Sequence, residues 1–83
     1  MNFEGIKFPL YRKYKNSKSY FKILGPEVFQ EIKLFGSRYA ISHFEAKIYP
    51  DRLFIHDLVS NEELTSTIAA EEFDALLAKA LAE

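Results

Sequence analysis

The chain has 83 residues, of which 48% are hydrophobic and 28% are charged, and its net charge is only −1. This length fits one domain with one small core, so we expect residues 1–83 to form a single unit, and the composition excludes disordered and fibrous chains. Cysteine is absent, which excludes disulfides, thiolate metal sites and a cysteine nucleophile. Because small secreted domains usually need disulfides, we expect a cytoplasmic protein.

The charges are unevenly distributed along the chain. Residues 1–38 hold eight basic and three acidic side chains, whereas residues 39–83 hold three basic and nine acidic ones. Two interpretations follow: an oriented surface potential, or two halves whose charges attract one another and intermix in the fold. The first 15 residues lack the apolar core of a signal peptide, and no segment approaches the roughly 18 apolar residues of a membrane span. We therefore expect no contact with a membrane.

The first half of the chain contains segments that read as strands. Residues 10–15 and 18–24 flank the turn-like sequence KNSK, and Gly25-Pro26 ends the second segment. Residues 27–35 carry apolar side chains on both alternating faces, which favours a central strand over a poorly amphipathic helix. A Gly-Ser turn then leads into residues 38–49.

The alternation of residues 38–49 divides them into two faces. Small and apolar side chains predict the covered face, which holds Ala40, Ser42, Phe44, Ala46 and Ile48. Mixed polar and aromatic side chains predict the face in water, which holds Tyr39, Ile41, His43, Glu45, Lys47 and Tyr49. Next, YPDR (49–52) reads as a turn and LFIHDLV (53–59) as a further strand. Residues 61–68 begin as a loop and end as a short last strand.

The last segment, residues 69–83, predicts a helix. Its apolar side chains recur at helical spacing, and acidic residues lie near its start, where the helix dipole favours negative charge. The apolar stripe consists of Phe73, Leu76, Leu77, Ala80 and Leu81. We therefore predict an α+β fold: an antiparallel β-sheet of four to six strands, packed on one face by a single C-terminal α-helix.

The segment YRKYKNSKSYFK, residues 11–22, concentrates five basic and four aromatic side chains. If Asn16-Ser17 forms a two-residue turn, Lys15 pairs with Lys18, and Tyr11 pairs with Lys22. One face of this hairpin then holds Leu10, Arg12, Tyr14, Ser19, Phe21 and Ile23, which we expect to be buried beneath the C-terminal helix. The other face is the candidate binding surface for a macromolecule and holds Tyr11, Lys13, Lys15, Lys18, Tyr20 and Lys22.

This candidate face has two interpretations. Tyrosines can stack on bases while lysines follow phosphates, which suits single-stranded nucleic acid. Lysine and tyrosine are also ordinary residues on the solvent-facing side of a sheet, where lysines prevent pairing between molecules.

The histidines and carboxylates provide one further candidate cluster. If YPDR closes a hairpin, Glu45 lies opposite His56, and His43 lies one pair away on the same face. These three could form a metal or acid–base site, or only an exposed pair. No glycine-rich phosphate loop and no nucleophile elbow is present. We therefore predict no enzyme, no cofactor and no metal.

The functional hypothesis from the sequence is a small non-catalytic module that binds an unknown protein partner. Two alternatives stay open: binding of single-stranded nucleic acid through the hairpin 11–22, and self-association of a structural protein through an exposed edge strand, giving a homodimer.

Overall fold

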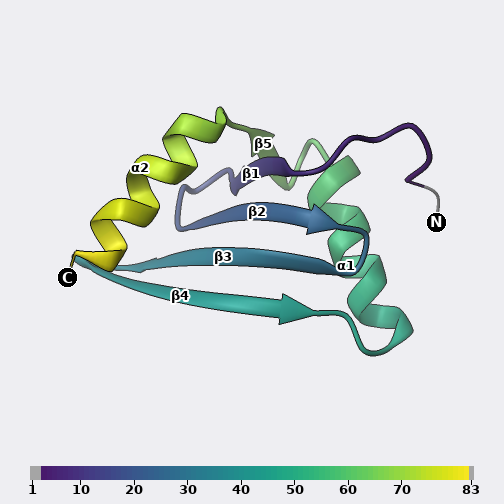
Figure 1. Cartoon of the computed structure of the whole chain (residues 1–83), viewed down its shortest axis with the longest axis horizontal. Coiled ribbons are helices and arrows are strands. Elements are labelled where there is room, and N and C mark those ends of the chain that lie inside the picture. The colour runs from purple at the N-terminus through teal and green to yellow at the C-terminus, as the bar shows by residue number, and fades with distance from the viewer. Residues whose placement is uncertain (1–2, 83) are drawn as a thin grey trace.

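The computed structural model describes residues 3–82 and contains a five-stranded antiparallel sheet with two helices (Figure 1). The strands lie in the order β4-β3-β2-β1-β5. The predicted class, an α+β fold with an antiparallel sheet and a C-terminal helix that contacts it, is confirmed. The elements are β1 Leu10–Tyr14, β2 Ser19–Gly25, β3 Val28–Phe35, β4 Arg38–Glu45, α1 Tyr49–Ser60, β5 Thr65–Thr67 and α2 Ala70–Leu81.

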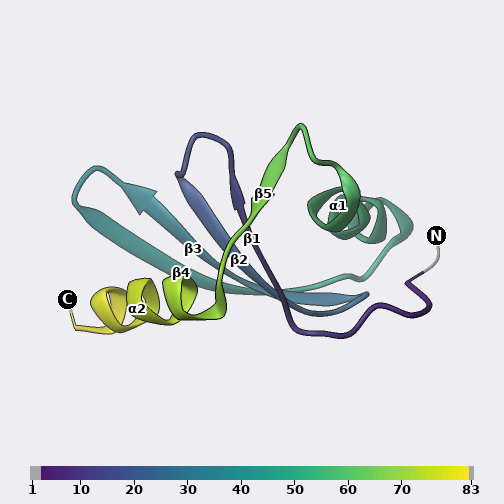
Figure 2. The ribbon, with the colours of Figure 1, turned by 90° about the horizontal axis from the view of Figure 1, so that it is seen from above.

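The first four strands form a meander of hairpins, and α1 then carries the chain across the sheet to place β5 beside β1 (Figure 1). The two helices lie on opposite faces and toward opposite ends of the sheet (Figure 2). We call the face with Phe21, Ile23 and Phe29 the α1 face, and the face with Tyr20 and Ile32 the α2 face.

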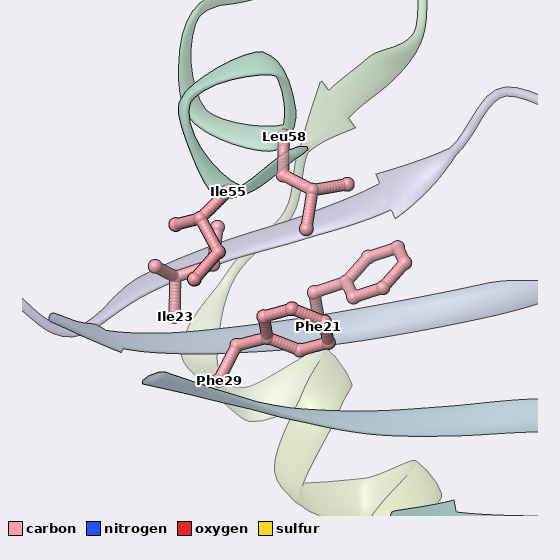
Figure 3. Close-up of a cluster of buried hydrophobic side chains, with 5 residues drawn as sticks. All are labelled: Phe21, Ile23, Phe29, Ile55 and Leu58. Atoms are coloured by element: carbon pink, nitrogen blue, oxygen red, sulfur yellow. The ribbon is translucent and has the colours of Figure 1, made fainter. Parts of the chain in front are cut away.

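The main core lies between α1 and the sheet. Ile55 and Leu58 of α1 pack on fully buried side chains of the two central strands, among them Phe21 and Phe29 (Figure 3). The rings of Phe21 and Phe29 meet edge to face with centroids 5.5 Å apart. Phe29 also stacks on Phe44 of β4 at 4.8 Å. Burying aromatic side chains in this way contributes a large share of the stability of a small domain.

The prediction of a YPDR turn followed by a strand at residues 53–59 is wrong, because this segment lies within α1. Pro50 occupies the first turn, where a helix tolerates proline. The carboxylate of Asp51 accepts hydrogen bonds from the backbone N–H groups of Lys47 (2.9 Å) and Ile48 (3.3 Å). The same four residues that suggest a turn therefore start a helix.

The second, smaller core lies on the α2 face. Phe73 and Ile32 are fully buried there, and the ring of Phe73 lies 5.8 Å from that of Tyr11. The predicted placement of the C-terminal helix over Phe21 and Ile23 is therefore wrong, although both of these side chains are buried as expected. The site that the sequence assigned to this helix is occupied by α1.

The two hairpin turns at one end of the sheet differ from each other. The β3–β4 turn is the predicted Gly-Ser turn, with Phe35 opposite Arg38 and a positive φ at Gly36. In the β1–β2 turn, the predicted pairs Tyr11–Lys22 and Lys13–Tyr20 are confirmed. The predicted Lys15–Lys18 pair is wrong because the ladder ends earlier: β1 stops at Tyr14 and β2 starts at Ser19.

Candidate interaction surfaces

The helix α2 divides the candidate face predicted from the hairpin into a half-buried part on the strands and an exposed part in the turn. Tyr11, Lys13, Tyr20 and Lys22 share the α2 face, as expected, but all four are half-buried. Lys13 lies 4.0 Å from the carboxylate of Glu72 of α2. From the sequence, this face was expected to lie in water because the C-terminal helix was assigned to the other side of the sheet.

Cation–π contacts further occupy the two tyrosine rings. The ammonium of Lys22 lies 5.9 Å from the ring centroid of Tyr11, and that of Lys13 lies 5.9 Å from the ring centroid of Tyr20. By contrast, Lys15 and Lys18 lie in the turn and are exposed. Of the six predicted residues, only these two lysines are well exposed, and they lie where the strands end.

The candidate cluster of His43, Glu45 and His56 does not form. His43 on β4 lies 3.7 Å from Glu45, and both side chains are exposed. His56 belongs to α1, where its ring packs at 5.8 Å from that of Phe3 and its Nδ1 lies 3.3 Å from the hydroxyl of Ser60. The helix carries His56 to the α1 face, whereas His43 and Glu45 are on the α2 face.

The strand β4 forms a free edge of the sheet, and the local sequence pattern does not identify it as an edge. Within residues 3–82, β4 pairs only with β3, so the other side of this eight-residue strand has no neighbouring strand (Figure 1). The opposite edge strand, β5, has only three residues. Short strands are one way in which proteins protect sheet edges, and β4 lacks that protection.

Hydrogen bonding identifies which backbone groups of β4 face outward. The amide of Ala46 donates to the carbonyl of Glu27 at 2.7 Å, which continues the register that pairs Val28 with Glu45. Hydrogen-bonded and non-hydrogen-bonded pairs alternate along an antiparallel ladder. Even-numbered residues of β4 therefore bond to β3, and odd-numbered residues direct their N–H and C=O groups to the free edge. These outward residues are Tyr39, Ile41, His43 and Glu45.

A second observation supports the same assignment. The amide of Leu34 donates to the carbonyl of Lys18 at 2.9 Å, so the even-numbered residues of β3 bond to β2. The odd-numbered residues of β3 are left to bond to β4, where their partners are even-numbered. Two independent hydrogen bonds thus define the free edge of β4.

Several features that protect sheet edges are absent from β4. The strand has no proline, no lysine and no register shift against β3, and its charged residues, Arg38 and Glu45, lie at its two ends. Its middle carries Ile41, which is 38% exposed. A long, regular edge strand without such devices is a template on which another polypeptide strand can pair.

Exposed apolar side chains lie at both ends of β4. Phe35, the last residue of β3 before the turn into β4, is 56% exposed, and Tyr49, at the start of α1 just after β4, is 64% exposed. Ile48 and Leu53 are exposed beside Tyr49. Aromatic residues of this kind anchor protein interfaces.

Two basic side chains lie beside Phe35 on the part of the α1 face that α1 leaves open, and a third lies in the neighbouring turn. Phe35 pairs with Arg38, and the ammonium of Lys33 lies 5.6 Å from the ring centroid of Phe35. Lys18 belongs to the neighbouring turn, as its backbone bond to Leu34 shows. Among residues 3–82, none of these three cations forms an ion pair.

Hollows on the surface of the described residues differ in size. The one between Tyr20 and α2 has a volume of about 160 Å³, whereas those beside Tyr14 and Glu63 and beside Glu27 and Lys47 have volumes of about 390 and 400 Å³. In residues 3–82 no three metal-binding side chains gather, and neither helix has the length and apolarity to cross a bilayer. Comparisons with protein-family models, curated proteins and solved structures find no match to this chain.

Proposed function

We propose that this protein is a non-catalytic interaction module that binds a partner polypeptide by adding a strand to the β4 edge. The observation that carries the proposal is the row of outward backbone groups on Tyr39, Ile41 and His43, beside which the described part of the chain places no strand. Strand addition satisfies such groups through main-chain hydrogen bonds, and side-chain contacts then provide specificity.

The side chains around the edge suit this mode of binding. Ile41 offers an apolar contact in the middle of the strand, and Phe35 and Tyr49 offer aromatic anchors at its two ends. Aromatic residues are enriched at protein interfaces whereas lysine is depleted, and β4 contains no lysine. The β4 edge therefore fits a protein partner better than the lysine-rich hairpin does.

Site-specific photo-crosslinking in the native cell tests this proposal. A photoreactive side chain replaces His43 on the edge, and a second variant carries it at Thr67 on the opposite edge strand. We expect a covalent polypeptide adduct from position 43 that is lost when Ile41→Pro is added, because proline removes an outward N–H group from β4. Equal labelling from both positions, or labelling that survives Ile41→Pro, would contradict strand addition.

A second candidate function is binding of single-stranded nucleic acid, and the group formed by Lys33, Phe35 and Arg38 favours it. Phe35 offers an exposed ring with the ammonium of Lys33 beside it, and Lys15 and Lys18 are exposed at the same end of the sheet. A base could stack on Phe35 while the cations contact phosphates. This site differs from the predicted one because it replaces the half-buried Tyr11 and Tyr20 with Phe35.

Fluorescence titration with a labelled oligonucleotide tests the second candidate. If nucleic acid binds here, the logarithm of the binding constant should fall with the logarithm of salt concentration, with a slope of about −0.7 for each phosphate contact. Phe35→Ala should weaken binding at every salt concentration, whereas Tyr11→Phe should not. No binding at low salt would remove this candidate.

Location in the cytoplasm belongs to the same proposal. A chain of 83 residues without cysteine has no disulfides, which small secreted domains usually need. Fluorescence microscopy of a tagged chain in the native cell tests this, and a signal confined to the envelope or the medium would contradict it.

A further inference from the structure

We infer that the strand that docks on the β4 edge is β4 of a second copy of this chain, so that two sheets join into one across a two-fold axis. This inference rests on the proposed function and names the partner of the same site. Two observations support it: the side chains that the pairing opposes, and the apolar residues at the two ends of β4. The alternation of inward and outward backbone groups then sets the register.

Only odd-numbered residues of β4 direct their backbone groups outward, which restricts the registers in which two copies of β4 can pair. In an antiparallel ladder, residues that exchange hydrogen bonds must both direct their backbone groups to the shared edge. The outward residues of β4 are odd-numbered, so an odd-numbered residue must meet an odd-numbered residue of the copy. Pairing Arg38 directly with Glu45 of the copy would violate this rule, and the axis must therefore pass through a residue.

An axis through Ser42 pairs all of the outward groups. Tyr39 then meets Glu45 of the copy, and Ile41 meets His43 of the copy, so every outward residue has a hydrogen-bonding partner. An axis through Ile41 leaves Glu45 opposite Ser37 in the turn, beyond the end of the partner strand. We therefore assign the register centred on Ser42.

The side chains opposed in this register are compatible. On the α1 face Ala40 lies opposite Phe44 of the copy, and the two Ser42 residues face each other. On the α2 face Ile41 lies opposite His43. No two like charges are opposed, whereas like charges directly across a ladder would destabilise it.

The ends of β4 complement each other in the same arrangement. Antiparallel pairing brings the start of one β4 beside the end of the other, so the end of β3 with Phe35 approaches the segment with Ile48 and Tyr49 of the copy. These are among the most exposed large apolar side chains of the chain, at 56%, 61% and 64%. Pairing would place them side by side and reduce their contact with water.

Light scattering across a concentration series of the purified protein tests for the dimer. We expect a mass of twice 9.7 kDa at high concentration. Ile41→Pro should give a monomer that retains its fold, because the lost N–H group points away from β3. Ala40→Pro is the matched control: its N–H group bonds to β3, so this variant should lose thermal stability. Tyr49→Ala should raise the dimer dissociation constant at least tenfold without lowering monomer stability.

Disulfide cross-linking tests the register, because the chain has no cysteine of its own. Ser42→Cys should form a covalent dimer on mild oxidation, since the two copies of this residue meet at the axis. Ala40→Cys on the same face should not, because its counterpart lies four residues away along the ladder. Cross-linking through Ile41→Cys in preference to Ser42→Cys would overturn this register.

The outcomes separate this inference from the proposed function. A monomer at all concentrations overturns the two-fold pairing. If photo-crosslinking from position 43 in the cell still captures a different polypeptide in a manner that Ile41→Pro abolishes, strand addition stands with another partner. If it captures no polypeptide, both proposals fail. A dimer that persists in Ile41→Pro and shows no cross-link through Ser42→Cys uses another surface and also overturns the inference.

Discussion

At the scale of single residues, two side chains join the end of α1 to the sheet. The last carbonyls of a helix have no partner within it. The hydroxyl of the buried Thr65 on β5 donates to the carbonyl of Leu58 at 3.0 Å, and the guanidinium of Arg12 on β1 donates to the carbonyl of Val59 at 3.5 Å. The shortest strand is thereby fixed to the helix that precedes it.

Thr65→Val should therefore destabilise the protein by about 1–3 kcal/mol, because it leaves a buried carbonyl without this donor. Thr65→Ser keeps the hydroxyl and should recover most of the difference. Chemical denaturation of both variants measures the free energies of unfolding. Equal values for the two variants would show that the hydrogen bond contributes nothing.

Ionisation of Tyr14 should make the free energy of unfolding depend on pH in the alkaline range. Burial raises the pKa of Tyr14 above its ordinary value of 10.0, and the nearby charge of Glu31 raises it further. Because the folded chain disfavours the phenolate, this contribution to stability is present below the ordinary pKa and is lost as pH rises through the raised value. The ring of Tyr14 also packs edge to face on Phe21 at 5.0 Å, a contact that phenylalanine can keep.

Tyr14→Phe should consequently lose less stability than the natural chain as pH rises from about 10 upward, because free tyrosine ionises there and Tyr14 in the folded chain resists ionisation. Thermal unfolding at several pH values measures this. The exposed Tyr49→Phe serves as the control and should follow the natural chain. If the melting temperature of Tyr14→Phe fell in parallel with that of the natural chain, the assignment of this alkaline loss of stability to Tyr14 would be contradicted.

At the scale of elements, α2 is held mainly by one side chain. Phe73 is its only fully buried residue within 70–81, whereas Leu81, assigned to the same stripe by spacing, is 69% exposed. Phe73→Ala should cost about 3–5 kcal/mol, and Leu81→Ala should cost almost nothing. Urea denaturation of both variants measures the difference. A large effect of Leu81→Ala would mean that the end of α2 packs on the sheet more tightly than its exposure indicates.

Local patterns in the sequence predict the elements better than they predict which face each element covers. Alternation and turn residues located β1 to β4, and helical spacing located α2, because these signals are local. The apolar segment at 53–59 is too short for its period to distinguish strand from helix. Once α1 was missed, the α1 face had no occupant, and α2 was assigned to it. The division of the predicted lysine–tyrosine face by α2 follows from this error.

The β4 edge was beyond prediction for a different reason. Tyr39 and Ile41 were correctly assigned to one face of a strand, but strand order depends on contacts between segments far apart in the sequence. In particular, β5 pairs with β1 at one edge only after α1 has crossed the sheet. Without this order, no local signal shows which strand lies at the other edge.

At the scale of the whole molecule, the two helices form two separate cores that share only the sheet. The core beneath α1 contains residues of β2, β3 and α1, whereas Ile32 and Phe73 lie on the other face. A chain that ends at Ile68 keeps all five strands and α1. We expect it to stay folded with a lower melting temperature, as shown by near-ultraviolet circular dichroism.

Leu58→Asp in the full-length chain provides the contrast, because it places an unpaired charge in the larger core and should unfold the protein. Complete unfolding of the shortened chain would show that the two cores form a single cooperative unit.

The order of the elements along the chain determines which apolar surfaces are uncovered during translation. Side chains of the meander, such as Phe21 and Phe29, leave the ribosome before α1, which covers them in the finished fold. Uncovered apolar surface and unpaired strand edges make partly folded chains prone to aggregate. Translation products that stop before residue 49 should therefore be insoluble, whereas products that extend beyond β5 should be recovered in soluble form.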